Sequence, residues 1–360
     1  MTRILLVIPT LTAGGAERIL SQLANHWAAE GYEISFALLG GGESFYPLDA
    51  EIKIHDMSHQ RVKNVSKILS LPATFFSLRA LVKRTEPDVI LSFLERFNMF
   101  TLSATKGLNV PICVADRNDP TRGLPPHLYW LKKKTYSWSS AVVVQTMIAK
   151  GILVDLLPQD HKLEVIPNFI RDVAEYSNVE RENLIVNVGR LCEQKNQASL
   201  IRSFAKLKNK KWRLCILGEG PKRADLEALA ATLGVADRLQ MPGAVKNVDE
   251  YLARASIFAF SSKFEGFPNA LCEAMASGLA CVSTNCNTGP AEVIQDEVNG
   301  YLVPVKGVSE MTQRLDALSE SLELRSKVGR NAKKIKERLA IGSIANEWML
   351  VLNEIVKVKL

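Results

Sequence analysis

The sequence predicts an α/β protein of two Rossmann-like, parallel-sheet domains, and three observations carry this prediction. Short apolar runs alternate with amphipathic segments, and near-continuous runs are typical of parallel strands covered on both faces. A chain of 360 residues is too long for one compact core. The polar stretch 171–183 separates two similar halves. We expect an N-terminal domain at 1–170, a C-terminal domain at 171–340, and a helix at 341–360 that packs back on the first domain.

The first half opens on an apolar run after Arg3 that resembles a secretion signal. An amphipathic pattern follows it without a break at 16–29 and stops at Gly31, which favours a buried strand feeding a glycine turn and a helix. The strands expected in this half are 3–9, 33–39, 88–93, 111–115, 140–145 and 163–167.

The second half repeats the alternation. Its expected strands are 183–189, 212–217, 238–241, 256–260 and 279–283. Helices are expected from about 197, at 222–233, after Pro268, and along the charged tail 309–357. Ligands of such folds bind at the carboxyl ends of the strands, here in a cleft between the two domains.

Composition limits the class of protein. The chain is 47% hydrophobic and 23% charged, with a net charge of +7, which is typical of a soluble globular protein. Its six cysteines show no CxxC or zinc-type spacing, so we expect reduced core residues in a cytosolic protein. No apolar run approaches the ~20 residues that a membrane-spanning helix needs.

Two glutamates eight positions apart, Glu265 and Glu273, are the most informative feature. Asn269 is a good N-cap for a helix over 270–277, with Gly278 as its stop. The free N–H groups of the first helical turn form a site for an anion between the two carboxylates. A nucleotide-sugar, with a central diphosphate and hydroxyls at both ends, fits this pattern. An acidic pair on a surface helix is the alternative.

Further residues at strand ends suit a diphosphate. Gly14 and Gly15 follow the first strand and allow a close backbone approach, although they do not form GxGxxG and a tight turn explains them as well. Arg190 and Lys195 lie at the next strand-to-helix turn and can straddle a diphosphate, unless they are two solvated surface charges. The chain contains no DxD motif, so we expect no metal and no other cofactor.

Two other runs are ambiguous. Residues 116–120, which include Arg117, follow a strand and either contact a donor sugar or acceptor or form a capped turn before Pro120. The run 288–292 opens another helix with similar ambiguity.

The stretch 61–84 is basic, lacks acids and carries two apolar stripes. It favours contact of Arg79, Lys83 and Arg84 with an anionic membrane surface or a lipid diphosphate, or else a core helix with a solvated basic face. The lysines at 132–134 lie among aromatic residues and add to the membrane interpretation. No nucleic-acid-binding motif accompanies these charges.

Together these residues resemble the retaining nucleotide-sugar glycosyltransferases of family four, which have the GT-B fold with two Rossmann-like domains facing a central cleft. The run SKFEGFPN at 262–269 with Glu273 matches the EX7E signature, and GRLCEQKN at 189–196 and VIPN at 165–168 match further family segments. The resemblance extends from Gly14 to Glu292. The family members that the chain resembles include the GalNAc transferases of bacterial lipid-linked oligosaccharide assembly.

The resemblance implies roles for residues. Glu273 binds the ribose, Glu265 touches the donor sugar near its anomeric carbon, and Arg190 and Lys195 bind the diphosphate. Many family members have a histidine where this chain has Arg117. The implied substrate-binding set is Gly14, Gly15, Arg117, Val245, Phe267, Pro268, Asn269, Ala270, Leu271 and Glu273.

We therefore expect an enzyme that transfers a hexose or N-acetylhexosamine, with retention, from a UDP-sugar to a glycan acceptor. The favoured acceptor is a polyprenyl-diphosphate-linked oligosaccharide of cell-surface polysaccharide, lipopolysaccharide or glycoprotein synthesis, at the cytoplasmic face of the cell membrane. A nucleotide-sugar epimerase of the same fold and a non-catalytic nucleotide-sugar-binding protein are the alternatives. A nicotinamide oxidoreductase is disfavoured because GxGxxG is absent.

Overall fold

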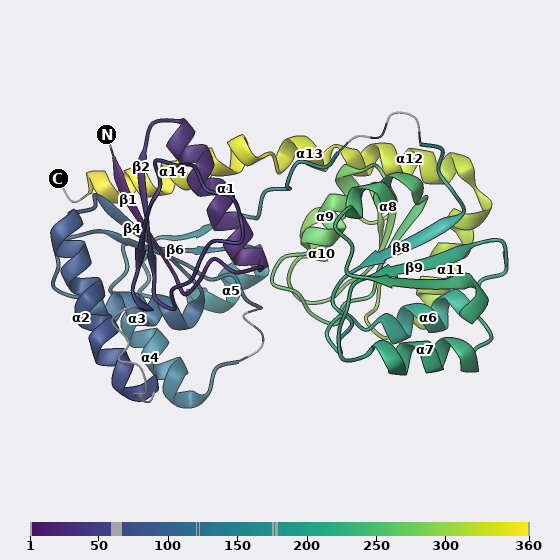
Figure 1. Cartoon of the computed structure of the whole chain (residues 1–360). Coiled ribbons are helices and arrows are strands. Elements are labelled where there is room, and N and C mark those ends of the chain that lie inside the picture. Colours follow the sequence, from purple (N-terminus) through teal and green to yellow (C-terminus); the bar gives the residue numbers. More distant parts are fainter. Residues whose placement is uncertain are drawn as a thin grey trace. The chain divides into compact units, whose positions relative to one another are not determined.

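The computed structural model describes residues 2–58, 67–119, 121, 123–174, 176 and 179–358, with the side chains of 67–70 left aside. The chain divides into two compact units, one formed by Met1–Phe169 with Ile341–Leu360 and the other by Ile170–Ala340 (Figure 1). Each unit is a parallel sheet with helices packed on it, so the predicted fold class is confirmed.

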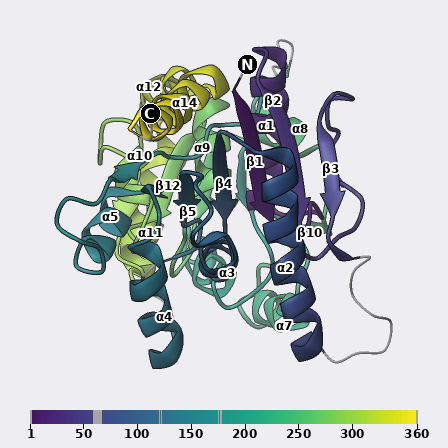
Figure 2. The ribbon, with the colours of Figure 1, turned by 90° about the vertical axis from the view of Figure 1, so that its left-hand side faces the viewer.

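The first unit, unit 1, contains a seven-stranded sheet of order β3-β2-β1-β4-β5-β6-β7, in which every pairing is parallel. Figure 2, which faces this unit, shows β1 and β4 running in the same direction. The strands are β1 (Arg3–Ile8), β2 (Glu33–Leu38), β3 (Lys53–Asp56), β4 (Val89–Phe93), β5 (Ile112–Ala115), β6 (Ala141–Val144) and β7 (Leu163–Val165). Strand β3 was not predicted, because it is a short edge strand with Lys53 and Ile54 exposed and therefore lacks an apolar run.

The helices of unit 1 cover both faces of its sheet. They are α1 (Gly15–Ala29), α2 (Lys67–Thr85), α3 (Glu95–Thr105), α4 (Pro126–Tyr136), α5 (Met147–Val154) and α14 (Ile341–Lys357). Helices α2 to α5 pack against alternate residues of the strands in one core cluster. On the other side α14 packs beside α1, where Trp27 Nε1 donates to the Ala345 carbonyl at 3.4 Å.

The second unit, unit 2, repeats this architecture with a six-stranded parallel sheet of order β10-β9-β8-β11-β12-β13. The strands are β8 (Leu184–Val188), β9 (Arg213–Leu217), β10 (Leu239–Gly243), β11 (Ile257–Phe260), β12 (Ala280–Thr284) and β13 (Tyr301–Val303). The helices are α6 (Gln197–Ala205), α7 (Arg223–Thr232), α8 (Val248–Arg254), α9 (Asn269–Ala276), α10 (Pro290–Val293), α11 (Val308–Glu320), α12 (Leu322–Lys333) and α13 (Ile335–Arg338). Strand β13, of three residues, was not predicted.

In both sheets the strand order reverses once, between β1 and β4 and between β8 and β11. The loops that leave neighbouring strands at such a reversal run to opposite faces of the sheet and leave a crevice for ligands. In unit 2 these loops are 189–196, after β8, and 261–268, after β11.

Among the described residues, no single helix has the length and apolar character to cross a membrane. One bent pair, Leu322–Arg338 with Ile341–Lys357, passes by length and composition alone. Several of its apolar side chains, among them Val328, Ile344 and Trp348, are buried, whereas Leu322 and Leu350 are exposed.

Candidate functional site

In unit 2, hydrogen bonds join the two loops that flank the reversal of strand order, 189–196 and 261–268. The N–H of Lys263 donates to the carbonyl of Gln194 at 2.8 Å, and Gln194 Nε2 donates to the carbonyl of Phe264 at 3.0 Å. Ser261 Oγ donates to the carbonyl of Lys195 at 2.8 Å. The backbone around Lys195 and Glu265 is therefore fixed from both sides.

The side chains of Lys195 and Glu265 meet within this frame. Lys195 Nζ lies 2.6 Å from Glu265 Oε1 and 5.3 Å from the centre of the Phe260 ring. The two side chains are only 19% and 7% exposed, so the ion pair is largely removed from water. Gly189 makes room for the lysine, because a Cβ there would lie 3.2 Å from Lys195 Cδ. The structure thus brings together two residues that the sequence places 70 positions apart.

Helix α9 begins one residue earlier than predicted. Pro268, not Asn269, occupies the N-cap position, so the predicted side-chain cap by Asn269 is wrong. The N–H of Asn269 donates to the Phe267 carbonyl at 3.0 Å, and among the described residues no backbone hydrogen bond from the N–H groups of Ala270 and Leu271 joins the start of the helix to the preceding loop. These two donors remain available to an anion at the start of the helix.

The run 288–292, ambiguous in the sequence, supports the Glu265 loop. Thr288 Oγ1 donates to the carbonyl of Glu265, and Phe264 pairs with Asn287 in an isolated parallel bridge. Gly289 has a φ of +120°, and a Cβ there would lie 2.5 Å from Pro268 Cδ. Only glycine permits this close contact between the loops.

Glu273 lies inside α9, as predicted, and is contacted by a residue that sequence analysis missed. Arg171 Nε lies 3.3 Å from Glu273 Oε2, and the Arg171 guanidinium also pairs with Asp249 on α8. The hydrogen bonds to Asp249 raise the pKa of Arg171 above its ordinary value. Neither residue belongs to a motif, and Arg171 lies in the polar stretch that was interpreted as a domain boundary, so no local pattern could have revealed them.

Arg190 lies in the same loop as Lys195, between β8 and α6, and Val245 lies in a different loop of unit 2. Arg190 is exposed just beyond β8, and its carbonyl accepts a hydrogen bond from Gln197 Nε2 at 3.1 Å. Val245 is half-buried in the loop between β10 and α8. Gly218 packs on the backbone beneath Arg190, since a Cβ there would lie 2.1 Å from the Gly189 carbonyl oxygen.

Gly14 and Gly15 form the entry to α1 in unit 1. Gly14 is the N-cap residue in an extended conformation, and its carbonyl accepts hydrogen bonds from Tyr46 Oη and Arg18 N, each at 3.0 Å. Gly15 is the first helical residue. Both therefore lie at the carboxyl end of β1, where the sequence placed them.

Arg117, expected to contact a donor sugar or acceptor or to belong to a capped turn, has partners inside unit 1. Its side chain is turned into unit 1, and the residue is 8% exposed. Nη2 donates to Asn168 Oδ1 at 2.9 Å, and the guanidinium lies over the rings of Phe93 and Trp348 at 5.0 and 5.4 Å. Burial lowers the pKa of Arg117 to about 9, so it remains a cation at neutral pH. In this position it braces the interior of unit 1, and its expected contact with a sugar or an acceptor stays a prediction.

The neighbouring Asp116 is also part of an internal network. Its carboxylate binds Lys132 Nζ at 2.6 Å and accepts from Tyr136 Oη, while Lys132 pairs with Glu95 as well. Burial opposes the charge on Lys132, but the two carboxylates hold its pKa above the ordinary value. Of the three lysines interpreted as interfacial, Lys132 is therefore a core residue, whereas Lys133 and Lys134 are exposed.

The basic residues near the carboxyl end of α2 lie close to the amino ends of the unit 1 strands, whereas Gly14 lies at their carboxyl ends. Arg79 is engaged inside the unit, where Nη1 donates to the carbonyls of Ala104 and Lys106 at 3.0 and 2.8 Å. Lys83 and Arg84 are exposed close to the amino ends of the strands. The other cations of this stretch, 61–67, lie outside the described side chains.

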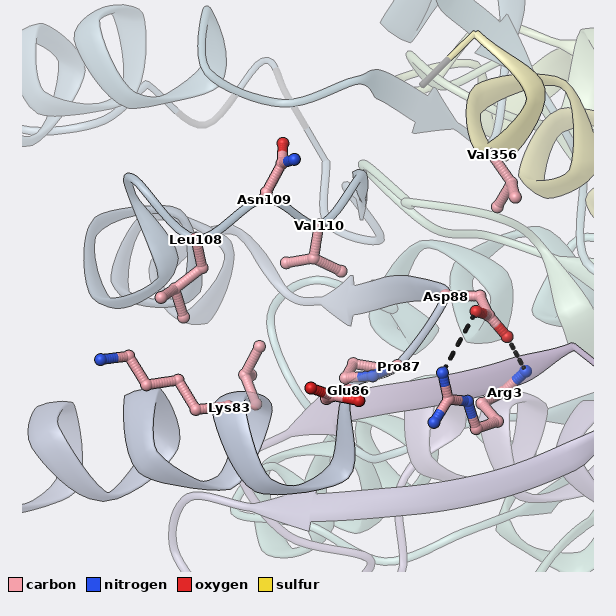
Figure 3. A pocket seen from close by; sticks show the side chains of 10 residues that line it. Arg3, Lys83, Glu86, Pro87, Asp88, Leu108, Asn109, Val110 and Val356 are labelled. Carbon is pink, nitrogen blue, oxygen red and sulfur yellow. Dashed lines mark hydrogen bonds and ion pairs between the residues drawn. The ribbon is translucent and has the colours of Figure 1, made fainter. Parts of the chain in front are cut away.

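Lys83 borders a hollow of about 530 Å³ at that edge, together with Glu86, Asn109 and Val356 (Figure 3). Two charged residues that line the hollow, Arg3 and Asp88, pair with each other. The N–H of Arg3 donates to Asp88 Oδ2 at 2.7 Å, and Arg3 Nη2 lies 3.5 Å from Asp88 Oδ1. The hollow therefore does not belong to the candidate site, which lies at the carboxyl ends of the strands where the strand order reverses.

Within the described part of the chain, no group of three or more histidine, cysteine, aspartate or glutamate side chains could hold a metal ion. The expectation that the protein works without a metal stays a prediction.

Comparisons with known proteins cover nearly the whole chain. The Glycosyltransferase Family 4 model matches residues 13–172, and the Glycosyl transferases group 1 model matches residues 169–335.

Among curated relatives, a Campylobacter jejuni protein described as "GalNAc-alpha-(1->4)-GalNAc-alpha-(1->3)-diNAcBac-PP-undecaprenol alpha-1,4-N-acetyl-D-galactosaminyltransferase" is 29% identical over 99% of each chain. The amylovoran biosynthesis glycosyltransferase AmsD of Erwinia amylovora is 25% identical, over 98% of this chain and 100% of its own. Among solved structures, Anabaena HepE in complex with UDP has a TM-score of 0.81 at 16% identity, over 98% of this chain and 100% of that one.

Proposed function

The chain belongs to the family 4 glycosyltransferases, with the GT-B fold, and on that premise we propose that it transfers a hexose or N-acetylhexosamine from a UDP-sugar to a lipid-linked glycan. We further propose that the anomeric configuration is retained. The observation that carries the proposal is the Lys195–Glu265 ion pair at the start of α9, with Glu273 one turn further along that helix.

The unit 2 site contains a group for each part of a nucleotide-sugar. The cation of Lys195 and the N–H groups of Ala270 and Leu271 suit the diphosphate. The carboxylates of Glu265 and Glu273 suit hydroxyl groups of the sugar and the ribose, because an ionised carboxylate only accepts hydrogen bonds. HepE, which shares the fold, was solved with UDP, and this supports UDP as the nucleotide.

The reaction needs a cation near the bond that breaks. As the bond between the anomeric carbon and the diphosphate oxygen breaks, negative charge grows on the diphosphate, where Lys195 and Arg190 stabilise it. A hydroxyl of the acceptor forms the new bond on the same face and gives its proton to the departing diphosphate, so no protein nucleophile is needed. Electrostatic groups of this kind contribute ~3–4 kcal/mol each to transition-state stabilisation.

The acceptor proposal is drawn from the relatives. The Campylobacter protein is named for a glycan carried on diphospho-undecaprenol, and AmsD for the synthesis of amylovoran. We therefore favour an oligosaccharide on a polyprenyl diphosphate, as in the synthesis of cell-surface polysaccharide, lipopolysaccharide or glycoprotein glycans. The enzyme would then act peripherally at the cytoplasmic face of the membrane.

We propose a membrane contact for unit 1 at exposed aromatic residues of α2 and α4, nearer the amino end of α2 than Lys83 and Arg84. Figure 2 shows α2 and α4 extending past the strand ends. They carry exposed aromatic side chains, with Phe76 66%, Tyr129 50% and Trp130 61% exposed. Lys134 Nζ lies 5.0 Å from the Trp130 ring centre, and Lys133 is exposed beside it. Aromatic residues next to cations suit the interface of an anionic bilayer.

Flotation with anionic liposomes separates the two membrane surfaces. We expect Phe76→Ser/Trp130→Ser to lose binding and Lys83→Glu/Arg84→Glu to keep it. If instead Lys83→Glu/Arg84→Glu lost binding and Phe76→Ser/Trp130→Ser kept it, the membrane contact would lie at Lys83 and Arg84, near the amino ends of the strands. Wild-type flotation of both variants would remove the membrane from the proposal.

The function is tested by incubating the protein with a panel of UDP-sugars and a polyprenyl-diphosphate-linked oligosaccharide. We expect UDP release that depends on the acceptor, a product longer by one or more sugars, and an α-linkage from an α-linked donor by NMR. Glu265→Gln should lose turnover, whereas Arg254→Gln, which removes a surface partner of Glu182, should not. Formation of an epimer or free sugar without acceptor would favour the epimerase, and no turnover with any donor would favour a binding protein.

A further inference from the structure

Arg171 occupies an unusual place in unit 2. It is the second residue of that unit, and its side chain, 21% exposed, reaches carboxylates on two different helices. One is Asp249 in the first turn of α8, and the other is Glu273 in α9. The backbone beside it is anchored, because the N–H of Ile170 donates to the Leu339 carbonyl at 2.8 Å.

Asp249 fixes the orientation of the guanidinium. Arg171 Nη1 donates to Asp249 Oδ2 at 2.9 Å, and Nη2 donates to Oδ1. The same carboxylate accepts from the N–H of Ala174 at 3.0 Å, which ties it to the segment that carries Arg171. A planar guanidinium held by two parallel hydrogen bonds has one orientation, and here that orientation directs Nε toward Glu273.

The contact with Glu273 engages one oxygen of its carboxylate. Arg171 Nε lies 3.3 Å from Oε2, and the Glu273 side chain is 10% exposed. A glutamate side chain has three rotatable bonds, and ordering them costs on the order of 1–2 kcal/mol. A partner that already holds one oxygen lowers this cost when the carboxylate accepts hydrogen bonds from a ligand.

We propose that Arg171 is a positioning residue that orients the Glu273 carboxylate toward the ribose hydroxyls of the donor nucleotide. This rests on the proposed function, in which Glu273 binds the ribose. Arg171 itself does not touch the nucleotide in this scheme. Its effect appears in the affinity for ribose-containing ligands and not in the bond-breaking step, because the ribose is remote from the anomeric carbon.

The test uses calorimetric titration with UDP and with 2′,3′-dideoxy-UDP, which lacks both ribose hydroxyls. We expect Arg171→Gln to weaken UDP binding about tenfold or more, as for a lost charge-assisted hydrogen bond. It should change the binding of dideoxy-UDP by less than about threefold and should raise the KM for the donor with little change in kcat. Arg171→Lys should recover part of the affinity. Arg254→Gln is the matched control, since it removes an arginine whose Nε lies 2.7 Å from the carboxylate of Glu182.

A double-mutant cycle separates the positioning role from a general role in folding. In a Glu273→Gln background, Arg171→Gln should weaken UDP binding no further. Equal losses for UDP and dideoxy-UDP, or losses that add to those of Glu273→Gln, would overturn the inference. Asp249→Asn serves if Arg171→Gln does not fold, and we expect it to weaken UDP binding while sparing dideoxy-UDP; equal binding losses for both ligands would count against the inference.

The two levels of the proposal fail differently. If Glu273→Gln binds UDP as tightly as the wild type, the ribose role of Glu273 is wrong. If Glu273→Gln loses affinity and Arg171→Gln does not, the proposed function stands and the inference about Arg171 is wrong.

Discussion

Removal of the charge on Lys195 should affect stability and activity in ways that can be separated. Lys195→Met keeps the length of the side chain and its packing beside Phe260, and it leaves the Glu265 carboxylate, 7% exposed, without its partner. Breaking a buried ion pair in this way costs about 3–5 kcal/mol. The lysine is 19% exposed, so we expect the lower end, about 3 kcal/mol of unfolding free energy.

The second variant, Lys195→Met/Glu265→Gln, removes both charges. Replacing a whole buried pair by neutral groups is often nearly neutral for stability, so this variant should regain most of the lost unfolding free energy. Turnover should not recover, because Lys195 is proposed to stabilise the leaving diphosphate. Both variants should be slower by about 10²–10³-fold.

Urea denaturation followed by circular dichroism gives the stabilities, and UDP release with donor and acceptor gives the rates. Arg254→Gln is again the control. A double variant as unstable as Lys195→Met would mean that the unpaired carboxylate is not the cause of the instability. Wild-type turnover of Lys195→Met would refute the proposed catalytic role.

Three further predictions concern metal, pH and thiols. Turnover should be the same with EDTA as with added Mg²⁺ or Mn²⁺; loss with EDTA and recovery with manganese would contradict a metal-free site. Burial opposes the charge on Asp249, but the hydrogen bonds from Arg171 and Ala174 hold its pKa below the ordinary 3.8, so its stabilising effect is present above that pH and is lost as the pH falls through the lower, folded value. The difference in unfolding free energy between the wild type and Asp249→Asn should therefore be constant above about pH 5 and shrink below about pH 4, and a gap that grows in acid would be the wrong sign. Burial raises the pKa of Cys113 to about 12 and of Cys215 to about 11, so Ellman's reagent should modify the half-buried Cys192 first and the five buried thiols only after unfolding; fast labelling of Cys113 in the native protein would show an opening absent from this structure.

Much of the fold and part of the site could be predicted because their signals are local. A buried parallel strand needs a continuous apolar run, and β1, β8 and β12 carry one. The spacing of Glu265 and Glu273 indicates a loop followed by a helical turn, and α9 has that geometry. Strand β3 was not predicted, because an exposed edge strand needs no continuous apolar run.

The misassigned residues have roles that depend on packing. Asn269 is a common cap type, yet the helix starts one residue before the predicted position and leaves its side chain inside the first turn. The sequence indicated a ligand contact or a capped turn for Arg117 and a membrane-facing position for Lys132. Both are buried because rings and carboxylates from distant segments surround them.

The sequence by itself determined most of the alternation of strands and helices, though not the short strands β3 and β13, and the motif residues that follow the strand ends. Both depend on neighbours within a few positions. Only the tertiary structure decided which charges meet, as in the contacts of Lys195 with Glu265 and of Arg171 with Glu273. These partners lie 70 or more positions apart, and their distance is set by how the sheet orders its strands. A charge carries no local signal of a partner that only packing brings to it.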